Sequence, residues 1–204
     1  NMLIPIELIE RVEIIKGPAA RIFGQNAFNG AINIVTKSAY KTRKGEFSAF
    51  LNNISGGSFG NFKYSVRGNI SKDNYKGLIN YSREKSNGYR YNTDYKTDNL
   101  FLKSSLSKNN PNTIVLATLS NRKFGANGFY ASPDATDQYE ETQTSLIGIY
   151  SRYSSGNLII KPKIYWRRNQ DEYIYVRSDP SIYRNLHKTN KISAEVNFNY
   201  ISSI

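Results

Sequence analysis

The side chains best suited to chemistry in this chain are four acidic residues within one segment and a single histidine. Asp134, Asp137, Glu140 and Glu141 lie close together, and His187 is the one histidine of the chain. Carboxylate oxygens are the ligands that Ca²⁺ prefers, so Asp134 and Asp137 are candidate calcium ligands. Their spacing does not follow the EF-hand pattern and includes no glycine turn, so the alternative is an acidic loop in water.

The chain offers few groups for catalysis. It contains no cysteine among its 204 residues, which excludes disulfide frameworks, thiolate zinc sites and cysteine nucleophiles. A general base would have to be the single histidine, a carboxylate, or a perturbed lysine or tyrosine. Because the usual catalytic constellations are missing, we expect no enzyme and name no catalytic residue.

Aromatic side chains form the larger group of candidate binding residues. The chain has 16 Tyr and 10 Phe against one Trp. Several of them lie in three polar segments, 86–96, 124–141 and 169–188, which we interpret as long loops. Tyrosine offers a large flat apolar surface and one hydroxyl at low entropy cost. The candidate ligand-contacting residues are Tyr89, Tyr91, Phe129, Tyr130, Tyr139 and Tyr175. The alternative is that these rings form small loop cores or an interfacial girdle.

The positive charge raises the question of nucleic-acid binding. The formal net charge is +12, and a clustered basic stripe would be the electrostatic footprint of such a protein. The surplus Lys and Arg residues are dispersed along the chain instead. We therefore expect no nucleic-acid partner, and a soluble basic β-protein remains a minor alternative.

Eight strands are expected after residue 44, and they must position the loops. Period-two alternation of apolar and polar residues is clearest in 61–72, 157–168 and 189–202. One face is apolar enough for lipid, and the other needs water or partners. A soluble sheet with one solvated face would alternate in the same way, and Pro162 counts against both readings. The expected strands are 45–55, 61–72, 75–85, 97–108, 112–123, 142–153, 157–168 and 189–202.

The expected connections alternate in length. Two or three residues, such as Asp73-Asn74, join some strands, whereas the three long loops join others. Outer-membrane barrels have short turns at one end and long loops at the other. The pattern therefore favours a transmembrane antiparallel barrel over a soluble sandwich.

Residues 9–37 read IERVEIIKGPAARIFGQNAFNGAINIVTK. They predict a strand, a stop at Gly17-Pro18, a helical turn over 19–23 and a second strand. This segment resembles the closing motif of the plug in TonB-dependent receptors, with mild departures at Phe23, Gln25 and Asn29. Its key motif positions include Arg11, Glu13, Gly17, Pro18, Gly24, Gly30 and Asn33.

The resemblance implies an all-β fold: a barrel of about 22 antiparallel strands around an α+β plug, of which about eight are present here. Residues 1–40 would be the end of the plug, and 45–204 the incomplete barrel. Arg11 and Glu13 would tether the plug to the barrel wall, unless they lie on a solvated strand face. The receptor would lie in the bacterial outer membrane, in contact with lipid, and would contact TonB through a plug segment outside this chain.

A second resemblance concerns the substrate. The run from Phe124 to Thr142, of the form F-G-x-N-x-F-Y followed by D-Q-Y-E-x-T, is similar to a loop of Bacteroidetes receptors known as vitamin B12 transporters. It implies active uptake of cobalamin or a related corrinoid, with calcium and a surface lipoprotein as further expected partners. The alternatives are a ferric siderophore or haem receptor and, outside this class, a surface barrel or adhesin without transport.

Overall fold

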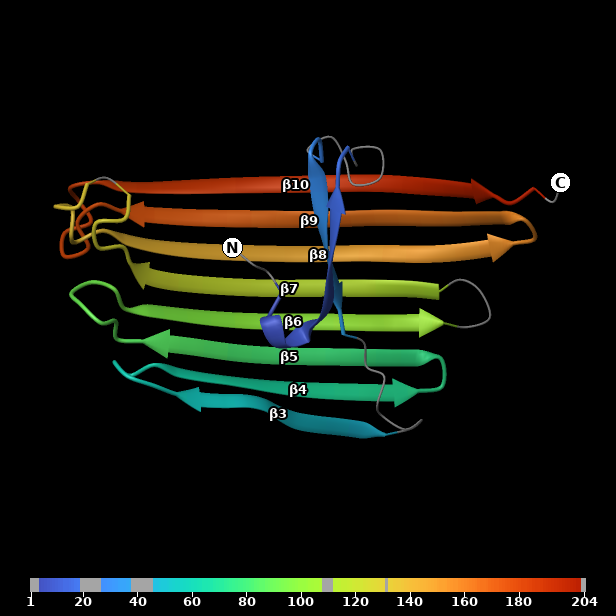
Figure 1. Ribbon diagram of the computed structural model, residues 1–204, viewed down its shortest axis with the longest axis horizontal. Helices are drawn as coiled ribbons and strands as arrows, with labels where there is room; N and C mark the ends of the chain where they lie inside the picture. Colours follow the sequence, from blue (N-terminus) through green and yellow to red (C-terminus); the bar gives the residue numbers. More distant parts are fainter. Residues whose placement is uncertain (1–3, 19–26, 38–45, 108–111, 131, 203–204) are drawn as a thin grey trace.

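The computed structural model describes residues 4–18, 27–37, 46–107, 112–130 and 132–202. The described residues form two sheets, one of two strands and one of eight (Figure 1). No helix long and apolar enough to cross a membrane occurs in these ranges. The elements are η1 (Ile6–Leu8), β1 (Ile9–Lys16), β2 (Gly30–Thr36), β3 (Phe47–Gly56), β4 (Phe62–Lys72), β5 (Tyr75–Ser86), β6 (Tyr95–Ser107), β7 (Asn112–Gly125), β8 (Tyr139–Ser155), β9 (Leu158–Ile174) and β10 (Arg184–Tyr200).

The larger sheet is an antiparallel meander. Each strand from β3 to β10 pairs with its neighbours in sequence, and within the described chain β3 and β10 pair on one side only. The sheet is therefore open. All eight strands expected from the sequence are present, which confirms the all-β prediction.

The last three strands are longer than expected. β8 and β9 run for 17 residues each, as does β10, and their added residues lie at the long-loop end. Both faces of the sheet carry polar side chains there, so the apolar–polar alternation fades although the strands continue. Tyr139, Glu140 and His187, which we expected in loops, consequently lie on strands.

The connections sort by length, as the sequence predicts. The loops 87–94, 126–138 and 175–183 gather at one end of the sheet, on the left in Figure 1. At the other end two-residue turns join β4 to β5 and β8 to β9. Asp73 and Gly156 open these turns with φ of 48° and 53°, the left-handed backbone that suits tight hairpins.

The two faces of the eight-stranded sheet differ in polarity. We call the face that contacts Leu8 and Thr36 the inner face, and the opposite one the outer face. The inner face carries many small polar side chains that are buried: Ser65, Asn69, Asn80, Ser82, Thr118, Thr142 and Thr144.

An apolar belt crosses the outer face. Its exposed members include Val66, Ile79, Leu102, Val115, Ile149, Ile164 and Val196. Aromatic rings border the belt on the long-loop side (Phe62, Tyr64, Tyr81) and on the short-turn side (Phe47, Tyr75, Tyr153, Tyr200). Such a belt between two aromatic girdles is typical of a sheet that faces lipid.

Pro162 lies inside the sheet. It faces Val196 of β10, but the pairing of β8 with β9 omits Ser151 and Arg152, the residues opposite Pro162 and Lys161. The ladder is thus interrupted where proline has no N–H to donate. The sheet accommodates this proline by losing its pairing on one side only.

Candidate ligand-binding site

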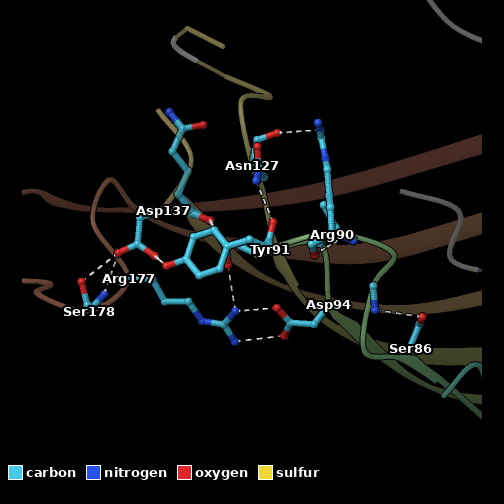
Figure 2. Close-up of polar contacts among 12 residues, drawn as sticks. Ser86, Arg90, Tyr91, Asp94, Asn127, Asp137, Arg177 and Ser178 are labelled. Carbon is cyan, nitrogen blue, oxygen red and sulfur yellow. Dashed lines mark hydrogen bonds and ion pairs between the residues drawn. The ribbon is translucent and has the colours of Figure 1, made fainter. Parts of the chain in front are cut away.

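Three long loops are tied together at one end of the sheet. The Tyr91 hydroxyl donates to Asp137 Oδ1 at 2.6 Å. The other carboxylate oxygen, Asp137 Oδ2, accepts from the Ser178 hydroxyl at 2.8 Å and from the Ser178 backbone N–H at 3.2 Å. Asp137 therefore joins the β5–β6, β7–β8 and β9–β10 loops (Figure 2).

Arg177 makes the second set of contacts between these loops. Its guanidinium donates to both oxygens of Asp94, at 2.6 and 3.0 Å, and to Asn92 Oδ1 at 2.9 Å. It also lies 4.5 Å from the ring centroid of Tyr139. The buried Asn92 side chain donates in turn to Gln138 O at 2.6 Å. We call Tyr91, Asn92, Asp94, Asp137, Arg177 and Ser178 the loop junction.

The junction should depend on pH through Asp137. The hydrogen bond from Tyr91, followed by those from Ser178, holds the pKa of Asp137 below its ordinary value. A lowered pKa contributes stability above the unfolded pKa of about 4, and this stability is lost as the pH falls through the folded value. We expect the hydrogen-exchange protection factors of 87–94 and 175–183, which correct for the intrinsic pH dependence of exchange, to be unchanged between pH 7 and 5 and to fall near pH 3. Asp137→Asn should flatten this dependence, and an equally steep fall in that variant would contradict the assignment.

Aromatic rings form a row beside the junction. Phe129 and Tyr130 meet edge to face with centroids 4.7 Å apart, Tyr130 meets Tyr173 at 5.6 Å, and Tyr173 meets Tyr183 at 6.2 Å. The Tyr130 hydroxyl donates to Glu140, and burial, followed by this bond, raises the pKa of Tyr130 well above its ordinary range. These rings hold one another in place on the inner side of the loops.

A pocket of about 420 Å³ opens between these rings and the inner face. Its volume lies in the range of small-molecule sites. Two guanidinium groups and several aromatic rings face one carboxylate there, a combination suited to a flat ligand that carries negative charge. The lining includes Arg90, Tyr95, Arg122, Phe124, Phe129, Tyr130 and Glu140.

The structure distributes the expected ligand contacts between two places. Phe129 and Tyr130 line the pocket, whereas Tyr91 and Tyr139 contact the loop junction. Tyr89 is exposed with Arg90 5.5 Å from its ring. Tyr175 is also exposed, and its backbone bonds to Tyr183.

Sequence reasoning missed the strand residues of the pocket. Arg122 and Phe124 lie near the end of β7, both facing inward, with the guanidinium 4.7 Å from the ring. Arg122 already lay within the expected strand 112–123, and extending the period-two alternation by one residue would have placed Phe124 on the same face. Arg177 had no such local signal, because its partners are more than 80 residues away.

The calcium prediction remains untested. Asp137 already accepts three hydrogen bonds from Tyr91 and Ser178, and Asp134 is exposed. Among the described residues no group of three or more His, Cys, Asp or Glu side chains is placed to hold a metal ion.

The β1–β2 hairpin lies across the inner face, with its strands crossing those of the larger sheet (Figure 1). Leu8, fully buried, packs into a small apolar patch with Leu78 and Phe101, with Leu116 beside them. Lys103 of β6 donates to Thr36 Oγ1 at 2.9 Å and to Thr36 O at 3.2 Å. Ile4 also packs against this patch, and Lys63 of β4 lies 3.8 Å from the Glu7 carboxylate. Apolar contacts, an ion pair and the Lys103 hydrogen bonds therefore attach the hairpin and the residues before it to the sheet.

The chain is similar to parts of known receptors and transporters. It is 33% identical over 84 residues to the ferric enterobactin receptor of Pseudomonas aeruginosa, covering 34% of the chain and 11% of that protein. It is 33% identical over 90 residues to the vitamin B12 transporter BtuB of Vibrio vulnificus, covering 44% and 14%. The copper transporter OprC has the same fold, with a TM-score of 0.74 at 14% identity over 96% of this chain and 31% of that one. No model of a known protein family matches the chain.

Parts of the chain are thus similar to siderophore receptors and vitamin B12 transporters, one of them named a TonB-dependent receptor, and its fold is that of a transporter of known structure. The names of these relatives are those of receptors and transporters rather than enzymes, as the sequence predicts. The chain spans only a small part of each relative. The assignment of the hairpin to the end of a plug and of the open sheet to a barrel wall, with the division at 40–45, stays a prediction.

The structure describes part of the segment that resembles the plug motif. Arg11 Nε and Asn33 Nδ2 both donate to the Glu13 carboxylate at 2.7 Å. These bonds, that of Asn33 first, hold the pKa of Glu13 below its ordinary value. The contacts that the structure shows for Arg11 and Glu13 lie within the hairpin, and the tether to a barrel wall expected of these two residues stays a prediction.

Gly17 and Gly30 suit their positions for different structural reasons. At Gly30 the backbone of β2 comes so close to β1 that a Cβ would lie 2.4 Å from Ile15 O. Gly17 has φ of 93° and precedes Pro18, which ends the strand. Gly24 and the helical turn over 19–23 lie outside the described residues.

Proposed function

We propose that the complete receptor takes up a scarce nutrient across the bacterial outer membrane with energy delivered through TonB. The observation that carries this proposal is the hairpin, our proposed plug end, attached to the polar inner face of the sheet, on the face that also lines a pocket under the joined loops. An outer face with an apolar belt supports residence in the membrane. A non-transporting barrel would have no need of a plug end docked in this way.

Cobalamin or a related corrinoid is the first proposed substrate, and a ferric siderophore is the second. The 124–142 loop resemblance supports the corrinoid. The relatives include a vitamin B12 transporter and a ferric enterobactin receptor at the same identity, which supports both. The guanidinium groups of Arg90 and Arg122 beside aromatic rings favour an anionic chelate. Uptake of haem in the experiment below would instead identify a haem receptor.

Uptake by the full-length receptor tests the proposal. The receptor is expressed in a bacterium that lacks its own corrinoid and siderophore receptors, and radiolabelled cyanocobalamin, ferric enterobactin and haem are supplied in turn. We expect uptake of one substrate that requires TonB and stops when the proton gradient is collapsed. Tyr130→Ala should reduce that uptake on the order of tenfold, because one stacking ring is lost, whereas Tyr89→Ala should not. Uptake that continues without TonB, or none of any substrate, would contradict the proposed function.

A further inference from the structure

We propose that three lysines on the outer face bind the phosphate groups of a lipid headgroup in the outer leaflet of the membrane. The inference rests on the proposed membrane barrel but concerns its lipid partner and not its nutrient. The three residues are Lys85 of β5, Lys96 of β6 and Lys123 of β7.

The strand register places these lysines in one row. Lys85 is directly opposite Lys96, and Lys96 is directly opposite Lys123. Side chains that face each other on paired strands lie about 5 Å apart at Cβ, and like charges in that position repel. Three neighbouring strands thus share an arrangement that costs free energy unless an anion lies between the ammonium groups.

Protein carboxylates compensate the row only in part. Lys123 pairs with Glu141 at 2.9 Å. Lys96 lies 3.9 Å from Asp98, whose other oxygen is bound by Arg83 at 2.5 Å. In the part of the chain that the structure describes, Lys85 has no ion-pair partner, and its side chain is exposed. The row therefore carries excess positive charge toward the outside of the barrel.

The height of the row along β5 matches a headgroup layer. Successive outward side chains of this strand are Ile79 in the apolar belt, Tyr81 in the aromatic girdle, Arg83 in an ion pair, and then Lys85. From Tyr81 to Lys85 the strand rises about 13 Å, or roughly 10 Å along the membrane normal at the usual barrel tilt. Lys85 consequently lies just beyond the hydrocarbon edge, where lipid phosphates lie.

The opposite edge of the belt lacks such a row. The outward residues at the short-turn end of the same three strands are Tyr75, Leu106 and Thr113, which are in register with one another. Within β5, β6 and β7 the outward lysines therefore lie only on the long-loop side, which is the outer leaflet of the proposed barrel, whereas β4 has a single outward lysine, Lys72, at the other end. Ammonium groups bind phosphate as point charges, so a phosphorylated headgroup fits this row better than a zwitterionic one.

Binding of lipid A to the full-length receptor tests the inference. The receptor with Lys85→Gln, Lys96→Gln and Lys123→Gln is purified in detergent and titrated with diphosphorylated lipid A, with dephosphorylated lipid A and with inorganic phosphate, by native mass spectrometry. The matched control is Lys72→Gln, compared with Lys85→Gln, because Lys72 also faces outward, opposite Tyr75 near the short turns. We expect the row variant to bind diphosphorylated lipid A on the order of 10- to 100-fold more weakly at low salt, and the control to bind like the unchanged receptor.

Several outcomes would overturn the proposal. Equal affinity of the row variant and the unchanged receptor would do so, as would equal binding of dephosphorylated lipid A. Equal competition by inorganic phosphate would assign the row to free anions instead of lipid. If the triple variant fails to show heat-modifiable migration, Lys85→Gln alone is titrated, and it should lose about threefold or more. If the row variant binds lipid A unchanged but still takes up the nutrient, the lipid-site proposal fails while the proposed transport function stands.

Discussion

Replacing Leu8 with alanine is expected to weaken the docking of the β1–β2 hairpin, the proposed plug end, on the eight-stranded sheet by about 2–5 kcal/mol. Leu8 is fully buried, and it packs in an apolar patch whose members are Leu78, Phe101 and Leu116. The surrounding inner face is polar, so the strands have no other apolar side chain to move into the space that the substitution leaves. The polar attachments that remain are the Lys103–Thr36 hydrogen bonds and the Lys63–Glu7 ion pair.

Hydrogen exchange of the full-length receptor in detergent measures this effect. Because each 1.4 kcal/mol corresponds to about tenfold, exchange in 9–16 and 30–36 should accelerate by roughly 30-fold or more. Ile6→Ala is the matched control, since Ile6 lies two residues earlier with a 68% exposed side chain. Equal protection in the two variants would mean that Leu8 does not hold the plug end.

Replacing Arg177 with methionine is expected to weaken substrate binding on the order of tenfold or more. The ion pair with Asp94 is more than a third exposed on both sides, so its own contribution is about 1 kcal/mol or less. The larger effect comes from the loops, because three segments that are ordered in the free receptor would have to be ordered on binding. Asn92 and the ring of Tyr139 lose the same partner at once.

Two measurements separate this effect from local damage. Limited proteolysis should cut 87–94 and 175–183 faster in Arg177→Met, and titration with the transported substrate should show the weaker affinity. Arg184→Met is the control, because Arg184 pairs with Glu172 on the adjacent strand at 2.5 Å and joins no loops. Faster cleavage without a change of affinity would show that the junction orders the loops but does not prepare the binding site.

The sequence predicts the strands better than the contacts between them. The sequence predicts a strand over 61–72 because Phe62, Tyr64 and Val66 alternate with polar residues. In the structure these three side chains point outward, and β4 begins at Phe62. The long-loop ends of β9 and β10 could not be predicted from the sequence, because beyond the apolar belt neither face of the sheet is apolar. A hydropathy pattern marks where a strand meets lipid, and it cannot mark where the strand ends in water.

The sequence contains a signal for the apolar patch that Leu8 contacts on the inner face. Leu78 next to Ile79, Phe101 between Leu100 and Leu102, and Leu116 next to Val115 each interrupt the alternation in neighbouring strands. An apolar residue on a polar face needs an apolar partner, and the register aligns the interruptions. Leu8 itself carries no periodic signal, since only the third dimension brings a residue 70 positions away onto this patch.

The pairing order of the large sheet also bears on how the wall is built. Every strand from β4 to β10 pairs with the strand that precedes it in the sequence, so each step closes only a short loop. Low sequence separation between contacts favours rapid, local formation. The wall can therefore grow one hairpin at a time, with each new edge serving as the template for the next strand. The free edge of β3 is where the last strand of a closed barrel would be received, and that single seam would be the slow step of its assembly.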